Sequence, residues 1–191
     1  LRKAAPGVPV PEATTGETLD ALTAAIADTG AQAVVFLGDF LHSSRSRVGP
    51  TMFALMKWRG QNSHITMTLV RGNHDLRAGD PPPELLINVV DEPLRLGPFA
   101  LCHHPRAVAG AYVLAGHWHP CVSVKGRAFE RLRLPCFWFG DDSGRLPANA
   151  IGILPAFGSF TGMHRIEARE GDRVFPVAEG TVRAIPRLPL T

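Results

Sequence analysis

Six of the eight histidines lie at or just after the ends of predicted strands, beside two aspartates and one asparagine. These residues are His42, His74, His103, His104, His117, His119, Asp39, Asp75 and Asn73. Imidazole, carboxylate and amide oxygen form a ligand set that suits manganese, iron or zinc. Two such ions about 3.5–4 Å apart can activate a water and hold both the entering and the leaving oxygen of a phosphate. The pattern predicts a two-metal hydrolytic centre, with Asp39 as the best candidate for the bridging carboxylate.

The elements before these residues predict an α/β fold. A capping box at residues 14–17, followed by apolar residues at helical spacing, predicts a helix over 15–29. Short apolar runs predict buried strands over 33–37 and 65–70, with a helix over 51–58 between them. This alternation favours parallel strands, whose carboxyl ends gather the functional loops at one edge of the sheet. Both polar motifs, at Asp39 and at residues 72–75, follow those strands.

The second half of the chain predicts a more antiparallel sheet. Short strands are expected over 86–90, 99–102, 112–115, 122–124, 132–139 and 150–154. Residues 165–168 and 174–178, joined through Glu170-Gly171-Asp172, predict a late hairpin. The length of 191 residues falls within the usual size of one domain. We therefore expect a single domain over 1–191.

Composition excludes several classes of protein. Hydrophobic residues make up 45% and charged residues 19%, which is typical of a globular chain and not of a disordered one. Three cysteines without a CxxC pair argue against a disulfide framework or a zinc knuckle. Apolar runs are too short to span a bilayer, and no signal peptide is visible. We expect a cytoplasmic protein without membrane partners, whose net charge of +3 is compatible with an anionic substrate.

Four motifs resemble, in order, those of calcineurin-like metallophosphoesterases. They are residues 38–42 (GDFLH), residues 72–75 (GNHD), His103 within residues 101–105 (LCHHP), and residues 116–119 (GHWH). The chain looks most like the bacterial ligase-associated DNA damage response endonucleases. Further stretches that carry this resemblance are residues 7–12 (GVPVPE), 134–140 (LPCFWFG) and 154–162 (LPAFGSFTG). The resemblance implies a metallophosphoesterase-like sandwich of two mixed β-sheets flanked by helices.

The resemblance also implies two divalent metal ions, with manganese first and zinc or iron as alternatives. Asp39 would bridge the two ions, Asn73, His103 and His117 would complete one site, and His119 would serve the other. The family begins with an Asp-x-His motif at the end of its first strand, and no such motif precedes Asp39 here. Because Leu1-Arg2-Lys3 is similar to the Leu-x-Lys that follows the motif, we expect the first strand and its ligand pair to lie upstream. One metal site would then be incomplete in this chain.

Catalytic and substrate roles follow from the same resemblance. His74 would contact the scissile phosphate and assist the leaving group, and Asp75 would orient or tune His74. His42 is similar to a histidine that lies near the substrate, with a surface loop position as the alternative, and Arg71 could pair with a phosphate. His104 is expected to be a neighbour of the site and not a ligand. Trp118 could stack on a base or pack against its loop, and Cys102 is expected to be buried.

The leading hypothesis is hydrolysis of phosphodiesters, with DNA as the substrate. By resemblance, the partners would be a DNA ligase and other repair proteins. Two alternatives stay open. The first is a nucleotide or phosphomonoester hydrolase, because the motifs define the reaction centre and do not choose the leaving group. The second is a degenerate phosphoesterase fold that serves as a non-catalytic scaffold.

Overall fold

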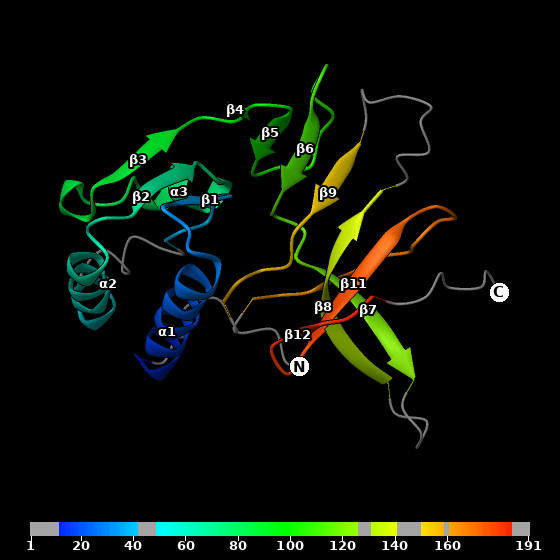
Figure 1. The fold of residues 1–191 in the computed structure, drawn as a ribbon, viewed down its shortest axis with the longest axis horizontal. Helices are drawn as coiled ribbons and strands as arrows, with labels where there is room; N and C mark the ends of the chain where they lie inside the picture. The colour runs from blue at the N-terminus through cyan, green and yellow to red at the C-terminus, as the bar shows by residue number, and fades with distance from the viewer. Residues whose placement is uncertain (1–11, 42–48, 126–130, 141–149, 159–160, 185–191) are drawn as a thin grey trace. The chain divides into compact units, whose positions relative to one another are not determined.

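A computed structural model describes residues 12–41, 49–125, 131–140, 150–158 and 161–184 (Figure 1). The chain divides into two compact units. The first unit comprises Leu1–Glu92 and Phe157–Phe160, and the second comprises Pro93–Ala156 and Thr161–Thr191. No helix of the described ranges is both long enough and apolar enough to cross a membrane.

The first unit is a parallel sheet with helices packed on it. Its elements are α1 (Glu12–Thr29), β1 (Ala33–Phe36), α2 (Pro50–Gln61), β2 (Thr66–Val70), α3 (Asn73–Ala78), the 3-10 helix η2 (Pro83–Leu85) and β3 (Ile87–Val90). The three strands pair in the order β1-β2-β3, all parallel. The expected helix-strand-helix-strand order is confirmed, with α1 and α2 slightly longer than predicted. Pro50 begins α2, where its missing N–H has no helical partner to lose.

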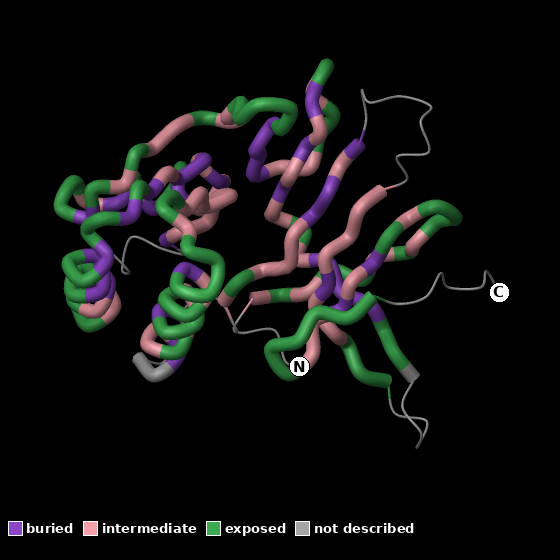
Figure 2. The backbone as a smooth tube through the Cα atoms, viewed as in Figure 1, coloured by how far each residue is buried: buried purple, intermediate pink, exposed green. Residues whose placement is uncertain are grey.

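The core of this unit lies between the two long helices and the sheet. Leu19 of α1, Leu55 and Trp58 of α2 and Met67 of β2 are buried together in one apolar cluster, and Figure 2 shows buried segments on both helices and on β2. The indole Nε1 of Trp58 also donates to Thr23 Oγ1 at 2.8 Å, which fixes α2 against α1. This packing provides a rigid base for the loops that follow β1 and β2.

The second unit contains one connected mixed sheet in its described residues. Its strands are β4 (Leu94–Leu96), β5 (Phe99–Cys102), β6 (Tyr112–Ala115), β7 (Pro120–Lys125), β8 (Arg131–Phe139), β9 (Ile151–Ile153), β10 (His164–Arg165), β11 (Arg173–Ala178) and β12 (Thr181–Val182). The main order is β10-β7-β8-β9-β6-β5-β4, with β11 paired to β8 and β12. The strands β5, β6 and β9 run parallel, while β7, β8 and β11 form antiparallel pairs. An α/β fold with two sheets and flanking helices is thus confirmed.

Two expectations about strand pairing were wrong. The strand at 87–90 does not join the second sheet but pairs parallel with β2 in the first. The expected hairpin of 165–168 with 174–178 is absent from the described pairs, because β10 pairs with β7 and β11 pairs with β8. Side chains explain the second difference. Val174 is buried with Val122 and Cys136, and the indole of Trp138 on β8 donates to Asp172 at 3.0 Å, so β11 is held on β8.

Candidate active site

Asp39 and Gly72 face each other where β1 and β2 end. The two strands are parallel, and Phe36 lies opposite Leu69. Asp39 and Gly72 each come three residues after this pair. A Cβ atom on Gly72 would lie 2.5 Å from Asp39 Oδ1 and 2.6 Å from its backbone nitrogen, so the approach requires glycine. Two residues after Gly72, the backbone amide of His74 donates to Asp39 Oδ1 at 2.9 Å. The Asp39 carboxylate is therefore held in place by the GNHD motif.

The GNHD motif itself begins a helix instead of continuing a loop. Asn73 is the first residue of α3, His74 the second and Asp75 the third. His74 and Asn73 are half-buried, whereas Asp75 is fully buried. Within the first unit the structure thus brings Asp39, Asn73, His74 and Asp75 together at one edge of the sheet.

The buried carboxylate of Asp75 accepts four backbone hydrogen bonds. Its Oδ2 receives the amides of Asp39 at 2.7 Å and Gly72 at 2.9 Å, and its Oδ1 receives those of Phe40 at 3.0 Å and Leu41 at 3.2 Å. These bonds compensate the cost of burying a charged group. The expectation was that Asp75 tunes His74, and that role stays a prediction. The contacts show a further role, in which Asp75 holds the backbone of residues 39–41 to the start of α3.

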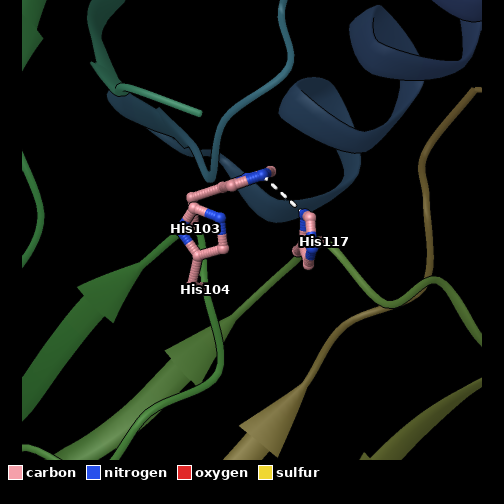
Figure 3. A group of neighbouring side chains, drawn as sticks. All are labelled: His103, His104 and His117. Carbon is pink, nitrogen blue, oxygen red and sulfur yellow. Dashed lines mark hydrogen bonds between the residues drawn. The ribbon is translucent and has the colours of Figure 1, made fainter. Parts of the chain in front are cut away.

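In the second unit, the ends of β5 and β6 bring His103 and His117 together. Cys102 lies opposite Ala115 in this parallel pair, and the amide of Gly116 donates to the carbonyl of His103 at 3.2 Å. The Nδ1 of His117 lies 3.0 Å from Nε2 of His103 (Figure 3). His103 is buried, and His117 is half-buried.

His104 completes a group of three imidazoles. One ring nitrogen from each of His103, His104 and His117 lies within 4.8 Å of the others. Two nitrogens that bind one ion at about 2.0–2.1 Å, in tetrahedral or octahedral geometry, lie roughly 2.9–3.4 Å apart. The 3.0 Å separation of His117 and His103 fits that requirement. The donor set therefore suits a divalent transition-metal ion.

His119 lies two residues beyond His117, and a hydrogen bond of its own orients its ring. Its Nδ1–H donates to the carbonyl of Gly162 at 2.9 Å, which selects the tautomer of the neutral ring and leaves Nε2 as the nitrogen that could bind a metal. The intervening Trp118 is 45% exposed, with its ring 6.0 Å from that of His164. An exposed indole at this position is compatible with stacking on a base, and packing against its own loop stays the alternative.

Three of the predicted metal ligands have a left-handed backbone. Asp39, His117 and His119 have φ angles of 56°, 64° and 48°. Among the described residues, only Leu86 and Glu179 share a positive φ without being glycine. This conformation costs a non-glycine residue roughly 1–2 kcal/mol, and such strain gathers at functional sites. The backbone geometry thus marks the same positions as the ligand chemistry.

Comparison with solved structures finds a similar nuclease. The crystal structure of the Pseudomonas putida nuclease MPE matches with a TM-score of 0.80 and 38% sequence identity, over 96% of this chain and 84% of that one. The chain belongs to the family of this nuclease. Protein-family models and curated proteins show no match. The similarity to the nuclease MPE family extends over residues of both units.

In this nuclease MPE family member, the structure describes only one of the two residues that were expected near the substrate. His42 lies outside the described residues. The guanidinium of Arg71 pairs with Asp80 at 2.8 and 2.9 Å and also with Asp91. These partners, first of all Asp80, raise the pKa of Arg71 above its ordinary value. Arg71 therefore has a structural role that the sequence did not predict, and its contact with a phosphate stays a prediction.

The cysteines of this nuclease MPE family member do not contribute thiolates. Cys102, Cys121 and Cys136 are all buried, as expected for Cys102. Burial raises the pKa of Cys136 to about 12 and that of Cys121 above its ordinary value. Because only the thiolate binds a metal well, nitrogen and oxygen donors are the better candidates for a metal site in this chain.

Proposed function

We propose that the chain is a metal-dependent phosphodiesterase that cleaves DNA. The observation that carries this proposal is the group of imidazoles at the ends of β5 and β6, in a chain of the same family as a nuclease. The motif resemblance to calcineurin-like metallophosphoesterases supports the same chemistry. By that resemblance, the role is endonucleolytic, in ligase-associated repair, with a DNA ligase and other repair proteins as partners in the cytoplasm.

We propose that residues 1–191 act as one metallophosphoesterase domain. Asn73, His103 and His117 would hold one divalent ion, His119 would serve the other, and Asp39 would bridge them. Manganese is the first choice, with zinc or iron as alternatives. Bound divalent ions supply an activated water and neutralise charge on the phosphate. The order of the four motifs along the chain supports this assignment.

The chain's own groups then fix and protonate the reacting atoms. Asp75 holds the backbone of Asp39 and the following two residues, and the His74 amide holds Asp39 Oδ1, so the bridging carboxylate is preorganised. The ring of His74 would donate a proton to the leaving oxygen of the ester. In the neutral ring of His119, the hydrogen bond from Nδ1–H to Gly162 selects the tautomer whose Nε2 carries the free lone pair.

A phosphomonoester or nucleotide hydrolase is the competing enzyme, and a non-catalytic scaffold is the competing binding protein. The family match to a nuclease favours the diesterase. The test compares catalytic efficiencies of the full-length protein with manganese on plasmid DNA, an aryl phosphodiester, nucleotides and an aryl phosphomonoester. Cleavage of DNA and of the diester is expected. Efficiency on a nucleotide or sugar phosphate that exceeds DNA by about a thousandfold, roughly 4 kcal/mol of transition-state preference, would favour the small-molecule hydrolase.

Asp39→Asn provides the active-site control for that comparison. It preserves the size of the side chain but removes the charge expected to bridge the ions, so activity should fall with every substrate. The matched control is Asp28→Asn, at an exposed position of α1, which should behave as wild type. If wild type and both variants hydrolyse no phosphoester, the hypothesis of a non-catalytic scaffold is preferred.

A further inference from the structure

We propose that His104 is a metal ligand, and that His103, His104 and His117 form a three-imidazole site held entirely by the second unit. With His104 added, three nitrogen donors shift the preference for this ion from manganese, the first choice for the motif ligands alone, toward zinc, cobalt or nickel. This inference rests on the proposed metal-dependent function and deepens it, because it adds a ligand that the motif resemblance does not supply. By the family resemblance, His104 was expected to be a neighbour of the site and not a ligand.

The end of β5 explains why adjacent histidines can serve one ion. In a strand, successive side chains point to opposite faces of the sheet. The strand β5 ends at Cys102, and His103 and His104 lie in a bend directly after it. The alternation of a strand therefore does not separate the two rings. Figure 3 shows both side chains beside His117, which comes from the loop after β6.

The three rings form a nearly equilateral triangle. Ring centroids are 4.7 Å apart for His103 and His104, 4.8 Å for His103 and His117, and 4.6 Å for His104 and His117. No pair is coplanar, with angles between ring planes of 85°, 73° and 51°. His104 is thus as close to His117 as His103 is. An ion placed among them would meet three rings that come from different directions, as a tetrahedral or octahedral ion requires.

Only a small movement of side chains is needed for all three imidazoles to bind one ion. The His103–His117 nitrogen pair is at 3.0 Å, and the ligand nitrogens of the whole group lie within 4.8 Å of one another. Binding to one ion requires nitrogens to approach to roughly 2.9–3.4 Å. A modest rotation of the half-buried His104 side chain would provide this. His103, which is buried, and the paired ends of β5 and β6 would keep the rest of the site fixed.

The donor set decides the class of metal. Three neutral imidazoles without a thiolate suit zinc, cobalt, nickel or copper and are poor ligands for magnesium or calcium, which prefer oxygen. Three protein nitrogens also leave coordination positions for water or substrate, as in catalytic sites. The second unit would then retain one ion without a ligand from the first unit. Asp39 would strengthen this site but would not be needed to form it.

The test is a titration of metal-free full-length protein with Co²⁺, followed by calorimetry and by the visible absorption of the bound ion. Four proteins are compared: wild type, His104→Ala, Asp39→Asn and the control His64→Ala, whose residue lies on an exposed turn of the first unit. His104→Ala should weaken Co²⁺ binding at least about 10-fold, since loss of even an outer partner of a ligand costs that much. His64→Ala should bind as wild type. Asp39→Asn should still bind one ion.

X-ray absorption of the Co²⁺-loaded proteins provides a second readout. Three imidazoles are expected in wild type and in Asp39→Asn, and two in His104→Ala. His104→Gln, which retains most of the side-chain volume, repeats the test if the alanine variant is poorly folded by circular dichroism. Unchanged Co²⁺ affinity and imidazole number in the His104 variants would overturn the proposal, as would loss of all binding in Asp39→Asn.

The two proposals fail separately. If the protein binds Co²⁺ through His104 but cleaves no phosphodiester, the three-imidazole site stands and the proposed function is wrong. If the protein cleaves DNA with manganese but its Co²⁺ affinity does not depend on His104, the proposed function stands and the three-imidazole site is wrong.

Discussion

The carboxylate of Asp75 accepts a hydrogen bond from the backbone amide of Asp39 at 2.7 Å. Three further amides, from Gly72, Phe40 and Leu41, complete the set around this buried group. The residue expected to bridge two metals is thus positioned by a carboxylate that lies 36 residues later in the chain. Stability of this loop and metal binding should therefore depend together on Asp75.

Asp75→Asn tests that dependence. The amide side chain has one acceptor oxygen in place of two, and its NH₂ group would face backbone donors. Because hydrogen bonds to a charged group contribute about 1.5–3 kcal/mol each, the free energy of unfolding should fall by about 2–4 kcal/mol. Urea denaturation of the metal-free protein measures the change. The control Asp28→Asn should stay within about 0.5 kcal/mol of wild type, as exposed positions usually do. A similarly small change for Asp75→Asn would show that the hydrogen bonds to Asp75 do not stabilise the fold.

The left-handed backbone at His119 gives a second prediction. Both His119→Gly and His119→Ala remove the imidazole, but glycine adopts a φ of 48° without strain. The glycine variant should therefore be more stable than the alanine variant by about 1 kcal/mol. At His164, which lies in β10, the order should be reversed, since glycine weakens a strand. Thermal or urea unfolding of the four variants decides this, and equal stability of the two His119 variants would show that no strain is stored there.

His74→Ala should separate catalysis from metal binding. Only the backbone amide of His74 is needed to hold Asp39 Oδ1, and alanine retains that amide. Metal content should therefore stay at the wild-type level while turnover falls by roughly 100-fold or more, the usual effect of losing a general acid. Elemental analysis and initial rates on the same samples provide both values. Loss of metal with unchanged turnover per bound ion would assign His74 to the ligands instead.

The buried cysteines predict slow reaction with thiol reagents. Since burial raises the pKa of Cys136 to about 12, its thiol stays protonated at pH 8 in the folded protein. Iodoacetamide labelling at pH 8 should be slow in the native protein and rapid in urea. The same shift predicts a pH effect with a definite sign. A folded pKa above the unfolded value of 9.0 favours the folded state below pH 9, and this contribution is lost as the pH rises toward 12. Fast native labelling of Cys136, read by mass spectrometry, would contradict its burial.

The parts of the site that the sequence predicted are those fixed by strand ends. Asp39 and the GNHD motif follow two apolar runs, and parallel pairing alone brings them together. The role of Asp75 could not be predicted, because its partners are backbone amides that have no signature in the sequence. His104 was expected, by resemblance, to be a neighbour of the site and not a ligand. The structure places its ring 4.7 Å from that of His103 and 4.6 Å from that of His117, a proximity that one-dimensional spacing does not show.

The late strands show a different limit of sequence reasoning. Residues 174–178 have a clear strand pattern and a turn before them, so a local hairpin was the simplest pairing. The structure instead pairs this strand with β8, from which it is separated by more than thirty residues. The decisive contacts, from Trp138 to Asp172 and from Val174 to Cys136, are long-range and do not alter the local pattern.

DNA cleavage should depend on a metal held by the histidines at the strand ends. The most direct measurement is nicking of supercoiled plasmid by the full-length protein, after metal removal with EDTA and after return of manganese, beside the variant His117→Ala. We predict no nicking without metal, recovery with manganese, and a loss of at least about 100-fold in the variant together with reduced metal content, because a ligand affects both. Nicking that persists in EDTA, or that His117→Ala leaves unchanged, would contradict the proposed function.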